Sequence, residues 1–444
     1  MTRSREQRGR LSRRKLIQAS VTAGTLGLTL AEILHLRAAQ DVARRKDTAV
    51  IQFWLGGGIS QFESWDPKPE APKEIRGPWS SIATNLPGVR ICELLPKQAR
   101  LADKYAVIRT VWHTDNKHGG GTTICSTGKK KAGDPSVGSV AARVRGPNRF
   151  GLPPYVQLKP VSTLNPAFIL NFNAQYLGAA YDPFDIEDSP AADTFSVPNL
   201  RMLKGISLDR LESRRELLQQ LDGSRRGAEH SGRAESLDQF QRAAFEMMTA
   251  PRTREAFDIS EEDPQLRERY GRHRWGQSAL LARRLVEAGV TFVNINTGPS
   301  SIIWDTHGGG SGTIGKTQQF NSLHMDGAVS TLIEDLYQRG LDKKVLLVVW
   351  GEFGRTPIIN DEFGRDHWST VGSLIVAGGG MRMGQVIGAT DAKGATAIER
   401  PVKAQDVIAT IYHHLGIPLN THFETHDGRP VPILDEGELI RELF

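Results

Sequence analysis

An almost continuous apolar run at residues 344–350 is the feature that most limits how this chain can fold. After its first lysine the run reads Val-Leu-Leu-Val-Val-Trp and offers no polar side chain to solvent. A strand with this pattern is buried on both faces, which is typical of a parallel sheet covered by helices. Further strands are predicted at 48–55, 106–111, 153–158, 290–296 and 374–377.

Helical periodicity occurs between these strands. Apolar residues recur at helical spacing at 94–105, 276–288, 321–338 and 404–415, and in the charged region 208–270, where two or three helices are expected. Strands that alternate with helices favour an α/β fold with a mostly parallel central sheet and helices on both faces. Because no internal repeat or long linker divides the sequence, we expect one elaborated domain after the N-terminal leader.

The composition excludes disorder and argues against a nucleic-acid partner. Hydrophobic residues make up 39% of the chain and charged residues 24%, a balance typical of folded proteins. The formal net charge is +6, but many basic residues lie in the first 15 positions or alternate with acids at 210–226. The two cysteines, Cys92 and Cys125, could form one disulfide or stay unpaired, and both alternatives stay open.

Residues 1–40 have the features of an export signal. Paired arginines, Arg13 and Arg14, precede a weakly hydrophobic run at 19–36, and this order matches a twin-arginine signal peptide. Glycines and a glutamate interrupt the run, so no stable membrane span is expected after processing. We expect residues 41–444 to form the exported protein, in the periplasm or outside the cell. An ordinary amphipathic helix with a basic start is the alternative.

Histidines and carboxylates gather in loops that follow predicted strands, which is where open α/β sheets place ligands. Asp305 and His307 can face one ion in an extended segment, because alternate residues share a side. Glu352 stands at the carboxyl end of a strand, and Asp366 lies beside His367, whose ring it could orient. Together these residues predict a divalent metal site. Mixed oxygen and imidazole ligands suit zinc or manganese better than calcium.

Two further groups of polar residues follow strands. His113 and His118 come after one predicted strand and before three glycines, near the start of a helix that would favour anions. We include His113 among the candidate metal ligands. Arg355 could hold a phosphate or sulfate group through two hydrogen bonds, and its alternative role is a salt bridge to Glu352 or Asp361.

Several motifs of the chain occur together in one known family. They are the glycine-led segment 56–69, Tyr-Gly at 270–271, the segment 281–290, Trp-Asp-Thr-His at 304–307 and Gly-Glu-Phe-Gly-Arg-Thr-Pro at 351–357. With the paired arginines they resemble the domain-of-unknown-function 1501 family over nearly all of the chain after the leader. That family is placed in the alkaline phosphatase-like superfamily, whose members hydrolyse phosphate or sulfate esters at metal centres. The resemblance therefore implies an alkaline phosphatase-like fold.

The resemblance also implies roles for individual residues. Counting back from the Thr-Gly pair at 127–128, which is similar to the closing Thr-Gly of sulfatases, puts the nucleophile position at His118. Cys125 is not followed by the pattern of a formylglycine precursor. The aspartate that superfamily enzymes carry after the first strand is replaced by glycine, which leaves Glu63 or Asp66 as substitutes. One complete metal site and an incomplete second one are therefore expected.

The predicted function is an exported metal-dependent hydrolase of phosphate or sulfate esters, with a small anionic ester or a sulfated or phosphorylated glycan as substrate. The alternative is a non-catalytic protein that keeps the fold and binds such a glycan, and a third possibility is that the histidine loops serve structure alone. The predicted catalytic residues are Arg355 and His118, which would act either as the nucleophile or by activating a metal-bound water. The predicted ligands of the divalent metal are Asp305, His307, Glu352, Asp366, His367 and His113.

Overall fold

The computed structural model describes residues 47–159, 172–197, 250–297, 303–425 and 427–444. All of them belong to one unit that begins at Asp47. The signal peptide expected at 1–40 and the part of the charged helical region at 208–249 lie outside the described residues. Where the chain is described, no helix is both long enough and apolar enough to cross a membrane.

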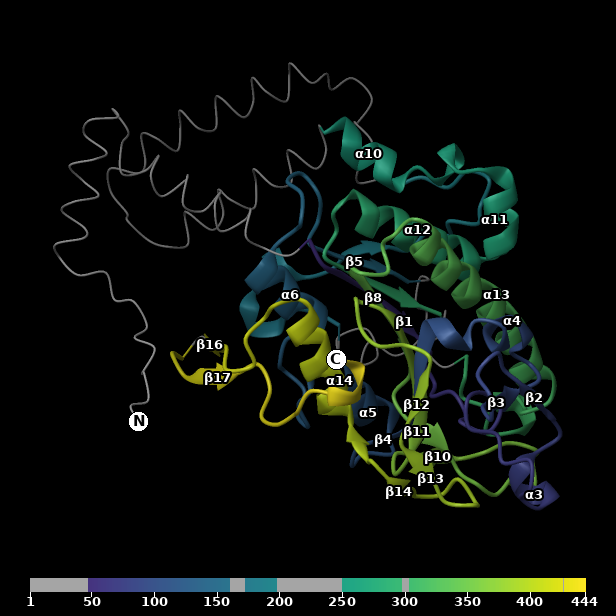
Figure 1. Cartoon of the computed structure of the whole chain (residues 1–444). Helices are drawn as coiled ribbons and strands as arrows, with labels where there is room; N and C mark the ends of the chain where they lie inside the picture. The colour runs from purple at the N-terminus through teal and green to yellow at the C-terminus, as the bar shows by residue number, and fades with distance from the viewer. Residues whose placement is uncertain (1–46, 160–171, 198–249, 298–302, 426) are drawn as a thin grey trace, which may run out of the picture. The chain divides into compact units, whose positions relative to one another are not determined.

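A central sheet organises the fold (Figure 1). Its strands lie in the order β12, β4, β11, β8, β1, β7, β5 and β6, and β15 also pairs with β4. Neighbouring strands are parallel except where β11 pairs with β4 and with β8. The strand bounds are β1 Ala49–Trp54, β4 Tyr105–Trp112, β5 Tyr155–Leu158, β6 Phe184–Ile186, β7 Phe292–Asn296, β8 Val345–Trp350, β11 Gly372–Gly378, β12 Gln385–Ile387 and β15 Val402–Lys403.

This topology confirms the predicted α/β fold with a mostly parallel sheet. The single antiparallel strand, β11, was predicted as a strand, but its direction was not. A short apolar run has the same pattern whichever way it enters the sheet, and only the length of the connections limits its direction.

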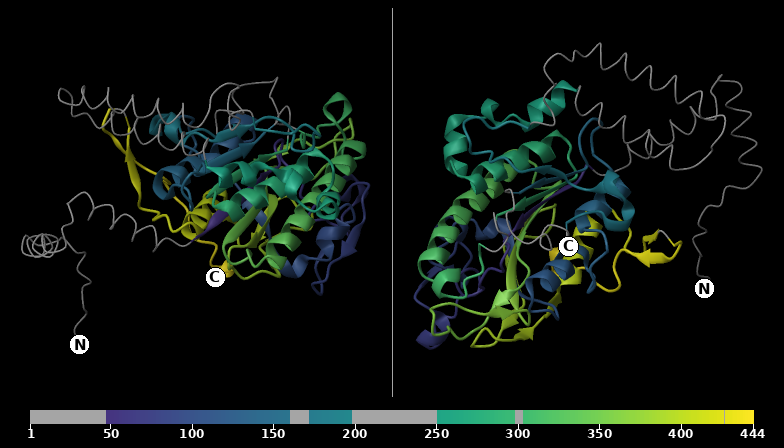
Figure 2. Two further views of the ribbon diagram at one scale, coloured as in Figure 1. Left: turned by 90° about the horizontal axis from the view of Figure 1, so that it is seen from above. Right: turned by 180° about the vertical axis from the view of Figure 1, so that it is seen from behind.

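Helices cover both faces of the sheet (Figures 1 and 2). The odd-numbered residues of β8 belong to a core shared with α12 (Arg274–Ala288) and α13 (Lys316–Gln338). Its even-numbered residues belong to the core on the opposite face, shared with α5 (His118–Thr127), α6 (Val137–Arg145) and α14 (Ala404–His414). Alternate strand residues point to opposite faces, so the continuous apolar run is explained by two helical layers.

Smaller elements complete the described part of the chain. One helix prediction was wrong, because the region 94–105 forms the short α4 and a 3₁₀ turn at Ala102–Lys104 before the chain enters β4. The Asp326 carboxylate of α13 accepts from the first amides of α4, those of Lys97 and Gln98. The remaining bounds are α3 Lys73–Arg76, α4 Pro96–Ala99, α10 Pro251–Phe257, α11 Pro264–Tyr270, and the strand pairs β2 Ser81–Ala83 with β3 Arg90–Cys92, β9 Gly354–Arg355 with β10 His367–Trp368, β13 Ala389–Thr390 with β14 Ala397–Glu399, and β16 His422–Glu424 with β17 Pro430–Pro432.

Both cysteines are free and buried, Cys92 at the end of β3 and Cys125 within α5. Of the two alternatives left open by the sequence, the structure therefore has the unpaired one. Burial raises the pKa of both thiols well above their usual range. A thiol that stays protonated is a poor nucleophile and a poor metal ligand, so neither cysteine enters the chemistry considered below.

The turn after β1 brings two distant parts of the chain together. Gly57 and Gly58 have φ of 106° and 82°, in the left-handed region that favours glycine. A Cβ atom on Gly58 would lie 2.5 Å from the ring of Phe353 and 2.8 Å from its carbonyl oxygen. The turn therefore passes directly against the chain that leaves β8, as the pairing of Trp54 with Trp350 requires.

We expect the Gly58→Ala substitution to destabilise the fold more than Gly88→Ala. Gly88 also has a positive φ, 78°, but its Cβ would meet nothing within 4 Å, so that substitution adds only backbone strain of about 1–2 kcal/mol. Gly58→Ala adds overpacking against Phe353, which costs about 1–3 kcal/mol more. Guanidinium unfolding of the three proteins measures the difference, and equal losses would contradict the close approach.

Candidate metal centre

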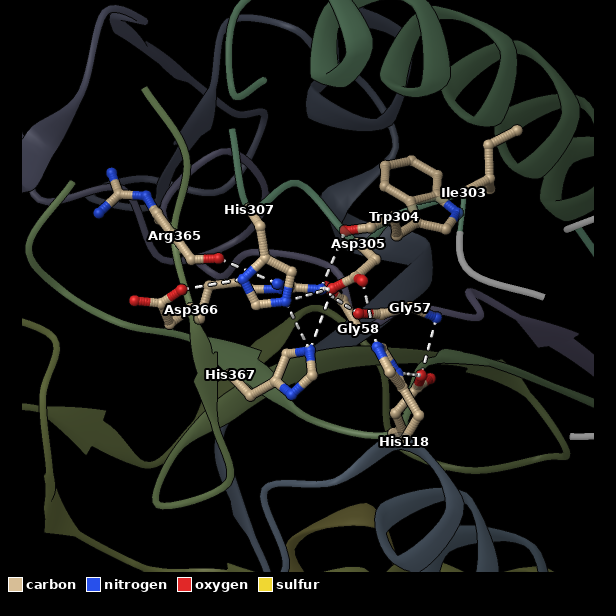
Figure 3. Close-up of polar contacts among 12 residues, drawn as sticks. Gly57, Gly58, His118, Ile303, Trp304, Asp305, His307, Arg365, Asp366 and His367 are labelled. Atoms are coloured by element: carbon tan, nitrogen blue, oxygen red, sulfur yellow. Dashed lines mark hydrogen bonds and ion pairs between the residues drawn. The ribbon is translucent and has the colours of Figure 1, made fainter. Parts of the chain in front are cut away.

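Four polar side chains converge at one edge of the sheet, as Figure 3 shows: those of His118, Asp305, His307 and His367. Each offers one ligand atom, and these four atoms lie within 4.8 Å of one another. The strands β4, β7 and β8 run in the same direction, so their carboxyl ends lie at this edge. His118 begins α5 after β4, Asp305 and His307 follow β7, and His367 begins β10 after β8.

Each of the three imidazole rings is fixed through its Nδ1 atom. The partners are a carboxylate or a carbonyl, which can only accept, so Nδ1 carries the proton and donates it. Each Nε2 then faces the cluster and is the atom that would bind a metal, as in metal-binding histidines. The Nδ1 distances are 2.7 Å from His118 to Glu352 Oε1, 2.9 Å from His307 to Asp366 Oδ1 and 2.6 Å from His367 to the Asn116 carbonyl oxygen.

The three Nε2 atoms meet around the Asp305 carboxylate. Those of His307 and His367 each lie 3.0 Å from Asp305 Oδ1 and 2.9 Å from each other. The Nε2 atom of His118 lies 3.2 Å from Asp305 Oδ2. A proton can bridge only one pair of these atoms at a time, whereas one cation among them would satisfy all four. The donor set therefore fits a bound metal ion.

Distances and ligand types agree with a first-row divalent metal. Zinc–nitrogen bonds of about 2.0–2.1 Å in a tetrahedron place neighbouring ligand atoms about 3.3 Å apart. The contacts of 2.9–3.2 Å around Asp305 are close to that spacing. Calcium takes six to eight oxygen ligands, so three imidazoles and one carboxylate fit it poorly.

The cluster is strongly polarised. Burial acts to lower the pKa of His118, but hydrogen bonds to Asp305 and Glu352 outweigh it and raise that pKa to about 9. Burial acts to raise the pKa of Asp305, but His118, His367 and Arg355 outweigh it and hold that pKa below its usual range. A metal ion entering the cluster must displace the His118 proton, so metal affinity is expected to rise with pH.

Arg355 lies beside Asp305 and is fully buried. Its Nη2 lies 2.5 Å from Asp305 Oδ1 and also donates to the Gly57 carbonyl. Its Nε donates to the Gly58 carbonyl at 3.0 Å, and its Nη1 donates to the Arg365 carbonyl at 2.9 Å. The guanidinium thus makes its salt bridge with Asp305 rather than with Glu352 or Asp361. Binding of a phosphate or sulfate group by Arg355 stays a prediction. The geometry favours a role in which Arg355 positions the Asp305 carboxylate.

The other predicted metal ligands lie outside the group of four. Glu352 accepts from His118 Nδ1 and Asp366 accepts from His307 Nδ1, so both carboxylates orient the rings. The sequence had suggested such an orienting role for Asp366. Asp366 orients His307, however, and not the neighbouring His367. His113 is buried and its Nε2 bonds the Glu352 carbonyl, away from the four ligand atoms, and burial lowers its pKa.

Neither substitute for the missing aspartate of the first strand reaches the cluster. Glu63 pairs with Arg365 at 2.7 Å, and Asp66 pairs with Lys68 at 3.1 Å. The incomplete second site expected from the sequence gains no carboxylate from either residue. Both acids are buried and bound by cations, so their role in the structure is to hold the loops around the sheet.

Two contacts of the centre are made by main-chain atoms. The Asn116 carbonyl accepts from His367, and the Gly57 amide donates to Glu352 Oε1 at 2.8 Å. No side-chain pattern signals a carbonyl contact. The glycines after the first strand were noted in the sequence as part of a motif, but the contact of Gly57 with Glu352 was not predicted.

Comparison with known proteins identifies the family. The model of a family described as "Protein of unknown function (DUF1501)" matches residues 47–444. The chain belongs to this family. The family recognised from the motifs is thereby confirmed for nearly the whole described chain, and no curated protein sequence matches this DUF1501 member.

Solved structures similar to this DUF1501 protein include a sulfatase, a phosphonate hydrolase and a protein of the alkaline phosphatase superfamily. Similarity at these TM-scores carries no conclusion about activity. They are the PsFucS1 sulfatase from Pseudoalteromonas sp. (12% identity, TM-score 0.37, 87% of this chain and 70% of that chain), the phosphonate monoester hydrolase SpPMH from Silicibacter pomeroyi (14%, 0.36, 89% and 76%) and the Vibrio parahaemolyticus superfamily protein (11%, 0.34, 84% and 67%).

We expect the purified DUF1501 protein to retain a divalent metal that is lost in His307→Ala and in His367→Ala. Asp366→Ala should keep the ligands but weaken metal affinity about 10–100-fold, because it removes the acceptor that orients His307. Elemental analysis and zinc titration measure both effects. His422→Ala, at an exposed histidine of β16, is the control and should bind metal like the wild type. Metal content unchanged in all variants would contradict this centre.

We expect Arg355→Met to lower the free energy of unfolding by about 3–5 kcal/mol, because it leaves a buried carboxylate without its cation. Urea unfolding in the presence of a chelator measures this loss without a contribution from metal. Arg252→Met, at an exposed position of α10, is the matched control and should change stability little. A loss below about 1 kcal/mol would contradict the anchoring role, since surface changes have effects of that size.

Proposed function

We propose that this chain is an exported metal-dependent hydrolase of phosphate or sulfate esters. One observation carries the proposal: three imidazole Nε2 atoms and the Asp305 carboxylate meet at the carboxyl edge of a mostly parallel sheet. Open α/β sheets bind their ligands at this edge. The twin-arginine features of residues 1–40 support export, since that pathway carries folded proteins.

The proposed metal ligands are His118, Asp305, His307 and His367. A bound divalent ion would supply Lewis-acid polarisation of an ester oxygen and a lowered pKa for water. The Gly57 amide donates to Glu352 Oε1 and fixes the carboxylate. The same Oε1 accepts from His118 Nδ1, so Glu352 holds the His118 ring in place and keeps the proton on Nδ1.

Access to the centre is proposed from the side of His307. The side chain of His307 is 32% exposed and that of Asp366 62% exposed, whereas those of Asp305 and His118 are 10% and 15% exposed. An ester that approaches from solvent would therefore meet His307 first. The deeper residues would hold the ion and exclude water from its other side.

His118 was predicted as the nucleophile or as the group that activates a metal-bound water, and the geometry supports the role of a metal ligand instead. Its Nε2 points at Asp305 among the other ligand atoms, where it would be occupied by the metal. Two hydroxyls near the glycine-rich loops are also engaged, since Thr123 donates to the Gly119 carbonyl at 2.7 Å and Ser60 donates to Glu63. We therefore propose that water attacks the ester.

The test is turnover of an aryl phosphate and an aryl sulfate by wild type, His307→Ala, His367→Ala and His422→Ala. We expect hydrolysis by wild type and by His422→Ala, and a loss of at least about 100-fold in kcat/KM in the other two, since removing one charge-stabilising contact costs 10²–10³. Metal without turnover on either ester would favour the glycan-binding alternative. Absence of metal from the wild type would contradict the proposed hydrolase.

A further inference from the structure

A small cavity beside the β2–β3 hairpin has the composition of an anion-binding pocket. Its volume is about 270 Å³, and none of the four residues of the metal centre lines it. Its lining contains no carboxylate. Besides two prolines, the lining residues are Lys68, Arg76, Trp79, Ser80, Ser81 and Arg90.

The sign of the charge distinguishes this cavity from a larger one. A cavity of about 760 Å³ lies where the segment 191–197 meets α10 and α11. It combines three arginines with two aspartates, so its lining does not select one sign of ligand. The small cavity combines three cations with hydroxyls and an indole, and it favours an anion.

The arginines of the small cavity keep their charge available. Lys68 is partly neutralised, because its Nζ lies 3.1 Å from Asp66 Oδ1. Within the described chain, the Arg90 guanidinium bonds Ser81 alone, at 2.8 Å from its Nε to the hydroxyl and through Nη2 to the carbonyl. Arg76 is exposed at the end of α3. Among the residues that the structure describes, neither arginine forms an ion pair with a carboxylate.

One acid lies in the same hairpin without entering the cavity. Glu93 accepts from the Ser80 amide at 2.7 Å through its Oε1 and does not line the cavity. The hydrogen bond from the Ser80 amide thus partly compensates the negative charge of Glu93. Two guanidinium groups remain, and guanidinium N–H groups are suited to the oxygens of sulfate or phosphate. Arg76 could offer a paired hydrogen bond, whereas Arg90 would contribute its Nη1, because its Nε and Nη2 bond Ser81.

Trp79 gives the cavity a fixed apolar wall. Its side chain is half-buried, and its Nε1 donates to the Ile314 carbonyl at 2.7 Å, which holds the indole in one orientation. A rigid aromatic ring beside a polar group offers a large contact area at a low cost in conformational entropy. The volume lies just below the 300–1,000 Å³ of drug-sized ligand pockets, so one small ring fits better than an oligomer.

We propose that this cavity binds a small sugar ring that carries a sulfate or phosphate group. Arg76 and Arg90 would contact the oxyanion, Trp79 the apolar face of the ring, and Ser80 and Ser81 its hydroxyls. Binding here requires no metal and no hydrolysis, so the inference stands apart from the proposed function.

The cavity is nevertheless linked to the loops of the metal centre. Trp79 bonds the loop that precedes α13, and Arg365 Nη2 donates to the Ile75 carbonyl at 2.6 Å. Arg365 directly precedes Asp366, which bonds His307. If the protein is the hydrolase proposed above, the cavity would hold a second anionic unit of the same glycan.

The experiment is isothermal titration of chelator-treated full-length protein with glucose 6-sulfate, glucose 6-phosphate and glucose. Chelation removes any contribution of the metal centre. We expect at least one of the two esters to bind at least tenfold more tightly than glucose, and the tighter ester names the oxyanion. Arg76→Gln and Arg90→Gln should each weaken binding of that ester about tenfold, and Trp79→Leu should weaken it while inorganic sulfate binding stays unchanged.

The control is Arg252→Gln, which removes an exposed arginine of α10 outside the cavity. Circular dichroism and unfolding establish that each variant is folded. Arg76 is the safer site, because its side chain bonds no strand of the described residues. Esters that bind no better than glucose would overturn the proposal. The same follows if Arg76→Gln and Arg90→Gln bind like the wild type, or if Arg252→Gln weakens binding equally.

Discussion

The ion pair between Asp305 and Arg355 is the constraint on which the candidate centre depends. Asp305 Oδ1 is shared by the Arg355 guanidinium and two imidazoles, at 2.5–3.0 Å. A buried carboxylate needs such partners, because its desolvation is costly. Arg355 in turn bonds the carbonyls of the glycine turn after β1 and that of Arg365. One guanidinium therefore joins the loops that follow β1, β7 and β8, and it fixes the carboxylate around which the histidines converge.

The covered sheet supplies the rest of the geometry. Two helical layers bury β1 and β8 on both faces, which fixes where each strand ends. Parallel strands then deliver their following loops to a single edge. That arrangement brings His118 and His307, distant in sequence, to opposite oxygens of one carboxylate. The sheet thus sets where the loops begin, and the Asp305–Arg355 ion pair holds them together.

Sequence reasoning could predict whatever depends on pattern. The apolar run of β8 predicted a strand buried on both faces, and the spacing of Asp305 and His307 predicted two side chains on one side of an extended loop. It could not predict what depends on tertiary approach. The direction of β11, the break after α4 and the Asn116 carbonyl beside His367 leave no trace in composition. Arg355 was predicted to hold an anion or to pair with Glu352 or Asp361, and only the folded structure shows that it bonds Asp305 and main-chain carbonyls.

The two carboxylates that accept from histidine Nδ1 atoms, Glu352 and Asp366, differ in their exposure to salt. Glu352, which orients His118, is 1% exposed, whereas Asp366, which orients His307, is 62% exposed. Ions in solution screen exposed pairs strongly and buried pairs weakly. Rising ionic strength would therefore loosen His307 while leaving His118 in place. A metal ion held here would first lose its bond to His307. Metal exchange would therefore proceed from the solvent side, while His118 and Glu352 kept their positions.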